Sequence, residues 1–445
     1  MVTPALARTL GLRDLVPIVV GTVIGSGIFL VPGSALRETA GDPGYALLVW
    51  LAGGLLSLLG ALTYGELGAM NPEAGGLYVY LRDAFGRFPA FLYGWTLFLV
   101  ISSGSTATLA VAFSNYLGQF VTLGPLGGKV AAILMIAAVA WVNVGGTRHG
   151  ARAQNWSTLI KVGALLSLAT VFLAAGAGLG RTAPRLFTAP FDLSLLSGMG
   201  VAMIGVLWAY EGWQYVTYSA GETLDPQRTF PRGIVLGTAA IIAIYLFANV
   251  GYLAALGPDA VARSDRVAAE AVDALLGPAA SRLVAAAVLV SVVGAANGIT
   301  LTAPRVYYAM ARDGLFFRRL ADVHPRYGTP AFAVVASSVW AAALAAWGTF
   351  EQLFTYVVFV GWIFYALGAA SLFVYRRRRP DAPRPFRVPG YPWTPVLFIA
   401  AAGAIVLNTI AAQRARALLG LVVILLGWPA YHWWKRRAAP TAPRP

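Results

Sequence analysis

Long runs of apolar residues, separated by short polar segments rich in arginine, cover most of the chain. A helix that crosses a membrane needs about 20 predominantly apolar residues, and twelve runs are predicted to reach that length. They are residues 14–37, 44–70, 84–117, 127–145, 153–178, 194–221, 232–256, 281–311, 330–348, 351–375, 393–412 and 416–434. Several exceed the minimum, which predicts tilted helices. We therefore expect an all-α polytopic membrane protein with 12 transmembrane helices.

Composition agrees with this expectation, and the charge distribution orients the chain. Of the 445 residues, 58% are apolar and 11% are charged, whereas soluble domains carry about 25% charged residues. With the amino terminus inside, about two thirds of the lysines and arginines fall on the inner side of the bilayer, as the positive-inside rule requires. The net charge of +15 therefore indicates topology and no nucleic-acid partner. We expect a multi-pass protein of the cell (inner) membrane with both termini cytoplasmic.

The first predicted span contains a cluster of small residues, Gly21-Thr22-Val23-Ile24-Gly25-Ser26-Gly27. Glycine costs about 1 kcal/mol at each position in a helix interior. Irregular backbone at membrane depth persists only where it is buried in protein or lines a cavity, because its polar groups need partners. The cluster therefore predicts a broken helix whose open backbone binds a ligand.

The sixth predicted span carries a second interruption, Trp208-Ala209-Tyr210-Glu211-Gly212-Trp213-Gln214. Transporters with inverted repeats have broken helices at matching positions in each half and bind substrate between them. Interruptions in spans one and six predict a 5+5 repeat, residues 14–178 and 194–375, with two extra helices over 393–434, all in one domain of residues 1–445. Glycines that merely permit close helix packing are the alternative explanation.

Five motifs in order resemble those of the amino acid–polyamine–organocation superfamily, and most closely its L-type amino acid transporters and their bacterial relatives. They are Gly21 to Phe29, Tyr64 to Tyr78, Trp208 to Glu222, Ala296 to Gly314 and Arg384 to Tyr391. The resemblance implies a LeuT-type bundle with broken helices 1 and 6. It also implies secondary active transport of amino acids by alternating access, as an exchanger or a proton-coupled symporter.

A free amino acid is a zwitterion, so its site needs donors for the carboxylate and acceptors for the ammonium. The amino terminus of a half-helix offers unpaired N–H groups and a positive dipole end. We expect Ser26 and Gly27 to bind the carboxylate, with the missing Cβ of Gly27 permitting close approach. The remaining predicted substrate-binding positions, mostly carbonyl acceptors for the ammonium, are Val23, Ile24, Gly25, Trp208, Ala209, Tyr210 and Glu211.

Lys161 lies inside the fifth predicted span, and ionisable residues within a membrane are usually functional. In sodium-coupled relatives a sodium ion lies where spans one, five and eight meet, and in others a lysine ammonium replaces it. The resemblance implies that Lys161 tethers the broken first helix and that transport is sodium-independent. Lys161 as carrier of a coupling proton, and a lysine snorkelling to the inner surface, stay open. Asn297 is predicted to bond Lys161 or the first break, or else only a neighbouring helix.

Glu211 has three interpretations. If its carboxylate faces the substrate, it selects cationic amino acids or polyamines. If it faces a neighbouring span, it is either the acceptor of a coupling proton or a structural hydrogen-bonding group.

Trp208 is predicted either to gate the site on its outer side or to pack in the core. Glu66 and Glu222 are predicted to form inner-gate or structural ion pairs with Arg305, Arg312 or Arg232. Residues 257–280 are predicted to form a short amphipathic helix over the outer mouth.

Other functional classes find little support in the sequence. Without cysteine and with three scattered histidines, no metal site or cofactor is predicted. An intramembrane enzyme, the distant alternative, needs a catalytic constellation, and only Glu211 and Lys161 qualify. Animal light subunits of the resembled family carry a cysteine between spans three and four for a disulfide-linked partner. Since residues 118–128 contain none, no disulfide-linked ancillary subunit is expected. The predicted partners are an amino-acid substrate, the lipid bilayer and, as an open question, protons.

Overall fold

A computed structural model describes residues 8–437, and these residues form helices joined by short loops without a β-strand. The first half contains α1 (Leu12–Val23), α2 (Gly27–Glu38), α3 (Pro43–Met70), α4 (Leu77–Phe85), α5 (Arg87–Thr96), η1 (Leu97–Ile101), α6 (Ser102–Leu117), α7 (Pro125–Val144), α8 (Thr147–Ala175), α9 (Leu179–Thr182) and η2 (Ala183–Arg185). The second half contains α10 (Leu193–Ala209), η3 (Trp213–Glu222), α11 (Pro226–Leu256), α12 (Pro258–Arg263), α13 (Val267–Leu276), α14 (Pro278–Thr302), α15 (Pro304–Arg312), η4 (Arg318–Ala321), α16 (Ala331–Trp347), α17 (Phe350–Arg378), α18 (Trp393–Ala412) and α19 (Arg414–Arg437).

The described residues contain 10 helices, or continuous helical segments, that are long and apolar enough to cross a membrane. The bent pair α1–α2 makes 11 if it is one span. The predicted span 330–348 corresponds to α16, which is apolar but only 17 residues long. The structure thus confirms an all-helical membrane protein.

Two predicted boundaries are wrong for local reasons. The predicted span 84–117 began too early, because Gly86 adopts a φ of +93° and separates α4 from the continuous helix Arg87–Leu117. The predicted outer helix over 257–280 is two helices, α12 and α13. Gly257 and Gly277, both with positive φ, bound this pair.

Both predicted helix interruptions are present. Helices α1 and α2 meet at an angle of 46° across Ile24 to Ser26. Helix α10 ends at Ala209, and the chain resumes as the 3-10 helix η3 after Gly212, whose φ of +129° strongly favours glycine. A Cβ on Gly212 would lie 3.0 Å from the carbonyl carbon of Thr22, so the two interruptions pack against each other.

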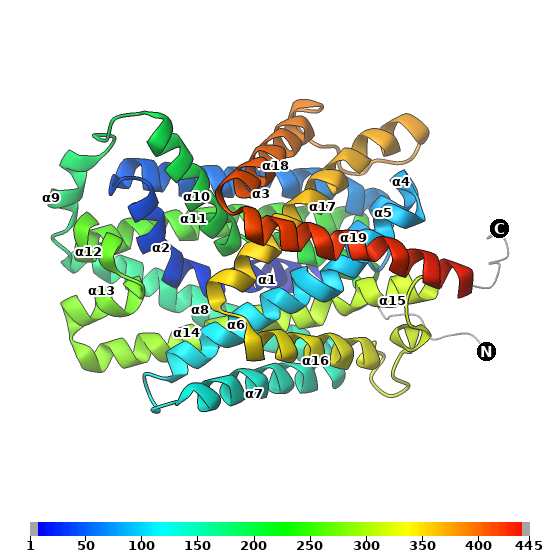
Figure 1. Ribbon diagram of the computed structural model, residues 1–445, viewed down its shortest axis with the longest axis horizontal. Helices are drawn as coiled ribbons and strands as arrows, with labels where there is room; N and C mark the ends of the chain where they lie inside the picture. Colours follow the sequence, from blue (N-terminus) through cyan, green and yellow to red (C-terminus); the bar gives the residue numbers. More distant parts are fainter. Residues whose placement is uncertain (1–7, 438–445) are drawn as a thin grey trace.

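The helices form an elongated bundle, and α15 and α19 finish at the same end of it (Figure 1). Helices α9, α12 and α13 lie at the opposite end (Figure 1). Helix α1 is surrounded by α8, α11 and α14. The broken segments are therefore enclosed by long, largely apolar helices.

Candidate functional site

Lys161, on α8, donates hydrogen bonds across the first helix break. Its side chain is 1% exposed, and its Nζ lies 2.5 Å from the Gly21 carbonyl oxygen, 2.7 Å from that of Ile24 and 3.2 Å from that of Ser291. The three protons of an ammonium thus have three carbonyl acceptors. The ammonium joins α8, α14 and the unwound end of α1, where the sequence predicted a tether.

Ser291, on α14, adds a second connection to the same break. Its Oγ lies 3.1 Å from the Ile24 carbonyl oxygen and 3.2 Å from that of Gly25. The carbonyls that the helix break frees from intrahelical bonding are therefore satisfied by α8 and α14, as buried backbone groups in a membrane require.

Tyr245, on α11, connects the two helix breaks. Its hydroxyl lies 3.1 Å from the Val23 carbonyl oxygen and 2.9 Å from that of Ala209. One hydroxyl proton serves one acceptor at a time. Two of the carbonyls expected to bind an ammonium thus share a donor within the protein and lie beside each other.

The amino terminus of α2 carries buried hydrogen-bond donors without a partner in the described part of the chain. The Ser26 Oγ is buried and has no hydrogen-bond partner among the described residues, and Ser26 itself is 1% exposed. Neither the Ser26 nor the Gly27 N–H donates to a described residue. Unpaired donors at the positive end of a helix suit a carboxylate.

The missing Cβ of Gly27 makes room for another helix and not, as predicted, for the substrate. A Cβ there would lie 2.5 Å from the Cα of Ala209. The missing side chain therefore admits the second broken helix, and leaves no free space for a ligand on that side. Gly27 is required for the contact between the two interruptions.

Glu211 faces a neighbouring span. Its Oε1 lies 2.6 Å from the Tyr365 hydroxyl and 2.5 Å from Nε2 of Gln214, and the side chain is buried. Gln214 Nε2 also donates to the Tyr365 hydroxyl at 2.7 Å. Among its three interpretations, these contacts favour a group that joins the second break to α17.

Trp208 and Tyr210 point in different directions. The Trp208 ring stacks on Phe354, with centroids 5.9 Å apart, and meets Phe350 edge-on at 6.3 Å. Tyr210 packs against Tyr245 and Trp50 with centroids 5.1 and 6.1 Å apart. Trp208 thus lies against the start of α17, whereas Tyr210 lies among aromatic side chains of α3 and α11.

Asn297 lies outside the Lys161 tether. Its Nδ2 donates to the Gly150 carbonyl at 3.0 Å and to Gln154 Oε1 at 2.9 Å, while its Oδ1 accepts from Asn143 at 2.8 Å. It therefore joins α14 to α7 and α8. A carboxamide both donates and accepts, so three helix contacts satisfy it without Lys161.

Two buried carboxylates form ion pairs with arginines. Arg305 Nε lies 2.6 Å from Glu222 Oε1, and both side chains are 1% exposed. This pair is among those predicted. Glu66 instead pairs with Arg376, in the last turn of α17, whose Nη2 lies 2.6 Å from Glu66 Oε2, and Val388 N in the segment after α17 also donates to Glu66. Arg232 and Arg312 form no ion pair with a described carboxylate.

Asp42 fastens the opposite end of the bundle. Burial disfavours its charge, but backbone N–H groups of Ala189, Phe187, Tyr45 and Thr188 outweigh that effect and lower the pKa of Asp42. It also caps α3 by accepting from Gly44 N at 2.8 Å. The loop before α10 is thereby held against the start of α3.

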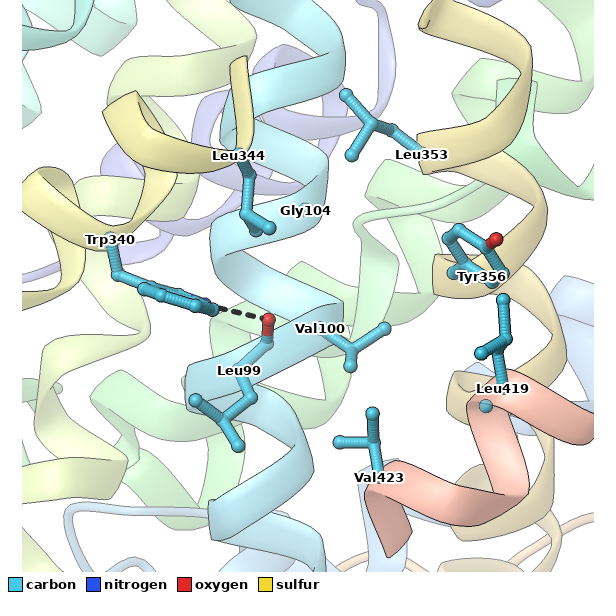
Figure 2. Close-up of a pocket in the computed structure, with 10 residues that line it drawn as sticks. Leu99, Val100, Gly104, Trp340, Leu344, Leu353, Tyr356, Leu419 and Val423 are labelled. Carbon is cyan, nitrogen blue, oxygen red and sulfur yellow. Dashed lines mark hydrogen bonds between the residues drawn. The ribbon is translucent and has the colours of Figure 1, made fainter. Parts of the chain in front are cut away.

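A cavity of about 260 Å³ lies away from these residues, between α6, α16, α17 and α19 (Figure 2). Its lining is almost wholly apolar, and the Leu99 carbonyl at its edge accepts from Trp340 Nε1 at 2.8 Å (Figure 2). It offers nothing that recognises a zwitterion. No group of three or more histidine or carboxylate side chains in the described part could hold a metal.

Sequence reasoning missed Tyr245, Ser291 and Tyr365, and it named Gln214 only as part of the second interruption. Each is a polar side chain within a long apolar run, which is a weak signal because hydroxyls and amides are tolerated in spanning helices. Only their position beside the two breaks reveals their contacts.

Comparisons with known proteins identify the family of the chain. The sequence model of the family described as "Amino acid permease" matches residues 10–426. The chain is 31% identical to the serine/threonine exchanger SteT of Bacillus subtilis over 98% of each chain. It is 33% identical to b(0,+)-type amino acid transporter 1 of Mus musculus, over 95% of this chain and 87% of that one. It is 31% identical to large neutral amino acids transporter small subunit 2 of Homo sapiens, over 97% and 82%.

Proposed function

Because the chain belongs to the amino acid permease family, we propose that it moves amino acids across the cell membrane by alternating access without sodium. The observation that carries the sodium-independent part is the buried Lys161 ammonium, which bonds carbonyls of both α1 and α14. A fixed cation with three acceptors leaves no need for a metal ion there.

The proposed substrate site lies between the two helix breaks. The Ser26 hydroxyl and the N–H groups of Ser26 and Gly27 bind the carboxylate, since they have no other partner among the described residues. The carbonyls of Val23 and Ala209 accept from the substrate ammonium when it displaces the Tyr245 hydroxyl. Trp208 closes the site from the side of α17.

The proposed topology has 12 spans, with α16 counted as the ninth. Residues 14–178 and 194–375 form the two inverted repeats, and α18 and α19 are additional. The matched breaks in α1–α2 and α10–η3 support this division. The arginine-rich end of the bundle, where α15 and α19 finish, faces the cytoplasm in this proposal, and both termini are assigned to the cytoplasm with it, which the positive-inside rule supports. The chain contains no cysteine, so it works without a disulfide-linked subunit.

Uptake of labelled amino acids into proteoliposomes tests the proposal. We expect equal initial rates in sodium and in choline buffers, and a requirement for sodium would overturn the assignment to Lys161. The same vesicles separate an exchanger from a symporter. Exchange requires amino acid inside the vesicle, whereas proton symport responds to an imposed pH gradient without internal substrate.

A further inference from the structure

Cationic and aromatic side chains from two distant parts of the chain meet at the end of the bundle where α15 and α19 finish. Helix α19 finishes there (Figure 1), and its Trp434 ring lies 5.2 Å from Phe317 and 5.1 Å from Phe316, measured between centroids. Arg318 and Arg319 follow Phe317 directly, and Lys435 and Arg436 follow Trp434. We call Phe317, Arg318, Arg319, Trp434, Lys435 and Arg436 the basic–aromatic patch.

The cations of the patch are available for a partner. All four are exposed, and none forms an ion pair with a described carboxylate. Asp313, the acid before them, is engaged by Arg82 and Tyr78. Elsewhere at this end, Arg82, Arg305 and Arg376 are paired with carboxylates. Four unpaired positive charges are therefore concentrated where the helices end.

Aromatic packing on α5 anchors the carboxyl end of α19, which carries part of the basic–aromatic patch. Tyr431, one turn before Lys435, is buried and packs against Phe88 and Phe91 with centroids 5.0 and 5.4 Å apart. Trp434 also lies 5.9 Å from Phe91. These contacts hold the last turns of α19 against α5, and the Trp434 contacts with Phe316 and Phe317 place the start of η4 beside them.

The neighbouring surface of α19 is suited to lipid tails. Three of its apolar side chains are largely exposed, those of Leu425 (68%), Leu426 (55%) and Trp428 (59%). Only 28% of the most apolar stretch of α19 is buried inside the protein. Phe317 is also 56% exposed. Aromatic side chains at the boundary of an apolar surface mark the headgroup level of a bilayer. Unpaired cations at that level attract anionic lipids.

We propose that the basic–aromatic patch binds the headgroup of an anionic phospholipid whose acyl chains lie along α19. The arginines and lysine contact the phosphate, and Phe317 and Trp434 contact the glycerol region. The exposed apolar face that leads to the cations favours a membrane lipid over a free phosphate.

Equilibrium binding of a fluorescent phosphatidylglycerol to the purified protein in detergent micelles tests this proposal. The patch variant carries Arg318→Gln, Arg319→Gln, Lys435→Gln and Arg436→Gln. The matched control removes four other exposed arginines without a described carboxylate partner, as Arg148→Gln, Arg152→Gln, Arg228→Gln and Arg232→Gln. We expect at least about 10-fold weaker binding for the patch variant, because each cation near an anionic surface contributes about fivefold, and much less change for the control.

Competition with the wild-type protein supplies an independent measurement. Unlabelled phosphatidylglycerol should displace the probe, whereas phosphatidylcholine and inorganic phosphate should not. Equal loss in both quadruple variants would overturn the patch in favour of net charge alone. Displacement by phosphate at lipid-like concentrations would instead assign a free-anion site, and equal displacement by phosphatidylcholine would reject anionic selectivity.

Discussion

Replacing Lys161 by methionine removes the ammonium while keeping most of the side-chain volume. The change leaves the Gly21 carbonyl without a partner, because no other described residue donates to it. The Ile24 carbonyl then shares the single Ser291 hydroxyl proton with the Gly25 carbonyl, while the Ser291 carbonyl lies inside α14. At least one buried carbonyl therefore becomes unsatisfied.

An orphaned buried acceptor costs about 1–3 kcal/mol. This cost falls on the state in which α1 is held against α8 and α14, so Lys161→Met should favour states in which α1 has moved. A shift of 1.4 kcal/mol corresponds to about tenfold in a population. We expect the exchange rate in proteoliposomes to fall about 10-fold or more, while the protein still folds and inserts.

Lys129→Met is the matched control, since Lys129 is exposed and lies in the first turn of α7. We expect its exchange rate to equal that of the wild type. Counterflow of a labelled amino acid, with protein quantity normalised by gel, measures both variants. A Lys161→Met protein that exchanges at the wild-type rate would refute the tether, as would an equal loss in Lys129→Met.

Three further predictions concern other contacts. Glu211→Gln should change the ratio between inhibition of amino-acid uptake by arginine and its inhibition by leucine less than about threefold, because Tyr365 and Gln214 can still bond the amide. A preference for arginine that is lost in the variant would restore the cationic-substrate interpretation. Arg305→Met should destabilise the protein by about 3–5 kcal/mol, since it leaves Glu222 buried and unpaired, and Arg305→Met with Glu222→Gln should recover part of the loss in thermal melting. Asp42→Asn should cost about 1–3 kcal/mol, because the amide nitrogen that replaces one carboxylate oxygen cannot accept from the backbone N–H groups that both oxygens of Asp42 bind. The pKa of Asp42 is lowered in the folded protein. The stability that the Asp42 carboxylate contributes is therefore present above its unfolded pKa near 3.8 and disappears as the pH falls through its folded pKa. The melting temperatures of variant and wild type should accordingly converge in acid.

The two helix breaks could be predicted from the sequence because they violate a strong rule. Glycine and carboxylate side chains in the middle of an apolar run are costly unless the backbone opens there. Lys161 could be predicted for the same reason, since an ionisable side chain within a span needs a buried partner. Where placing a residue inside the membrane costs free energy, the residue type alone indicates a function or a compensating contact.

Partner identity was harder to predict than the presence of a buried charge. Glu222 and Arg305 lie near the ends of the sixth and eighth predicted spans, and their pairing was among the options. The predicted partner of Glu66 was wrong, because α17 packs against α3 and brings Arg376, in the last turn of α17, to Glu66. The segment after α17 adds Val388 N, which donates to Glu66 at 2.7 Å. Neither the packing of two distant helices nor the path of a loop leaves a periodic signal in the sequence.

The hydrogen-bond partners of buried hydroxyl groups could not be predicted from the sequence. Thr238 and Thr108 donate to carbonyls four residues earlier in their own helices, those of Ile234 and Gly104. Ser291 and Tyr245 instead bond across helices to the broken first span. A serine or threonine in a spanning helix can satisfy itself locally, so its presence carries no cost that demands a partner elsewhere. The hydroxyls that hold the site together can therefore be distinguished from the self-satisfied ones only by the backbone carbonyls that the two helix breaks place within reach.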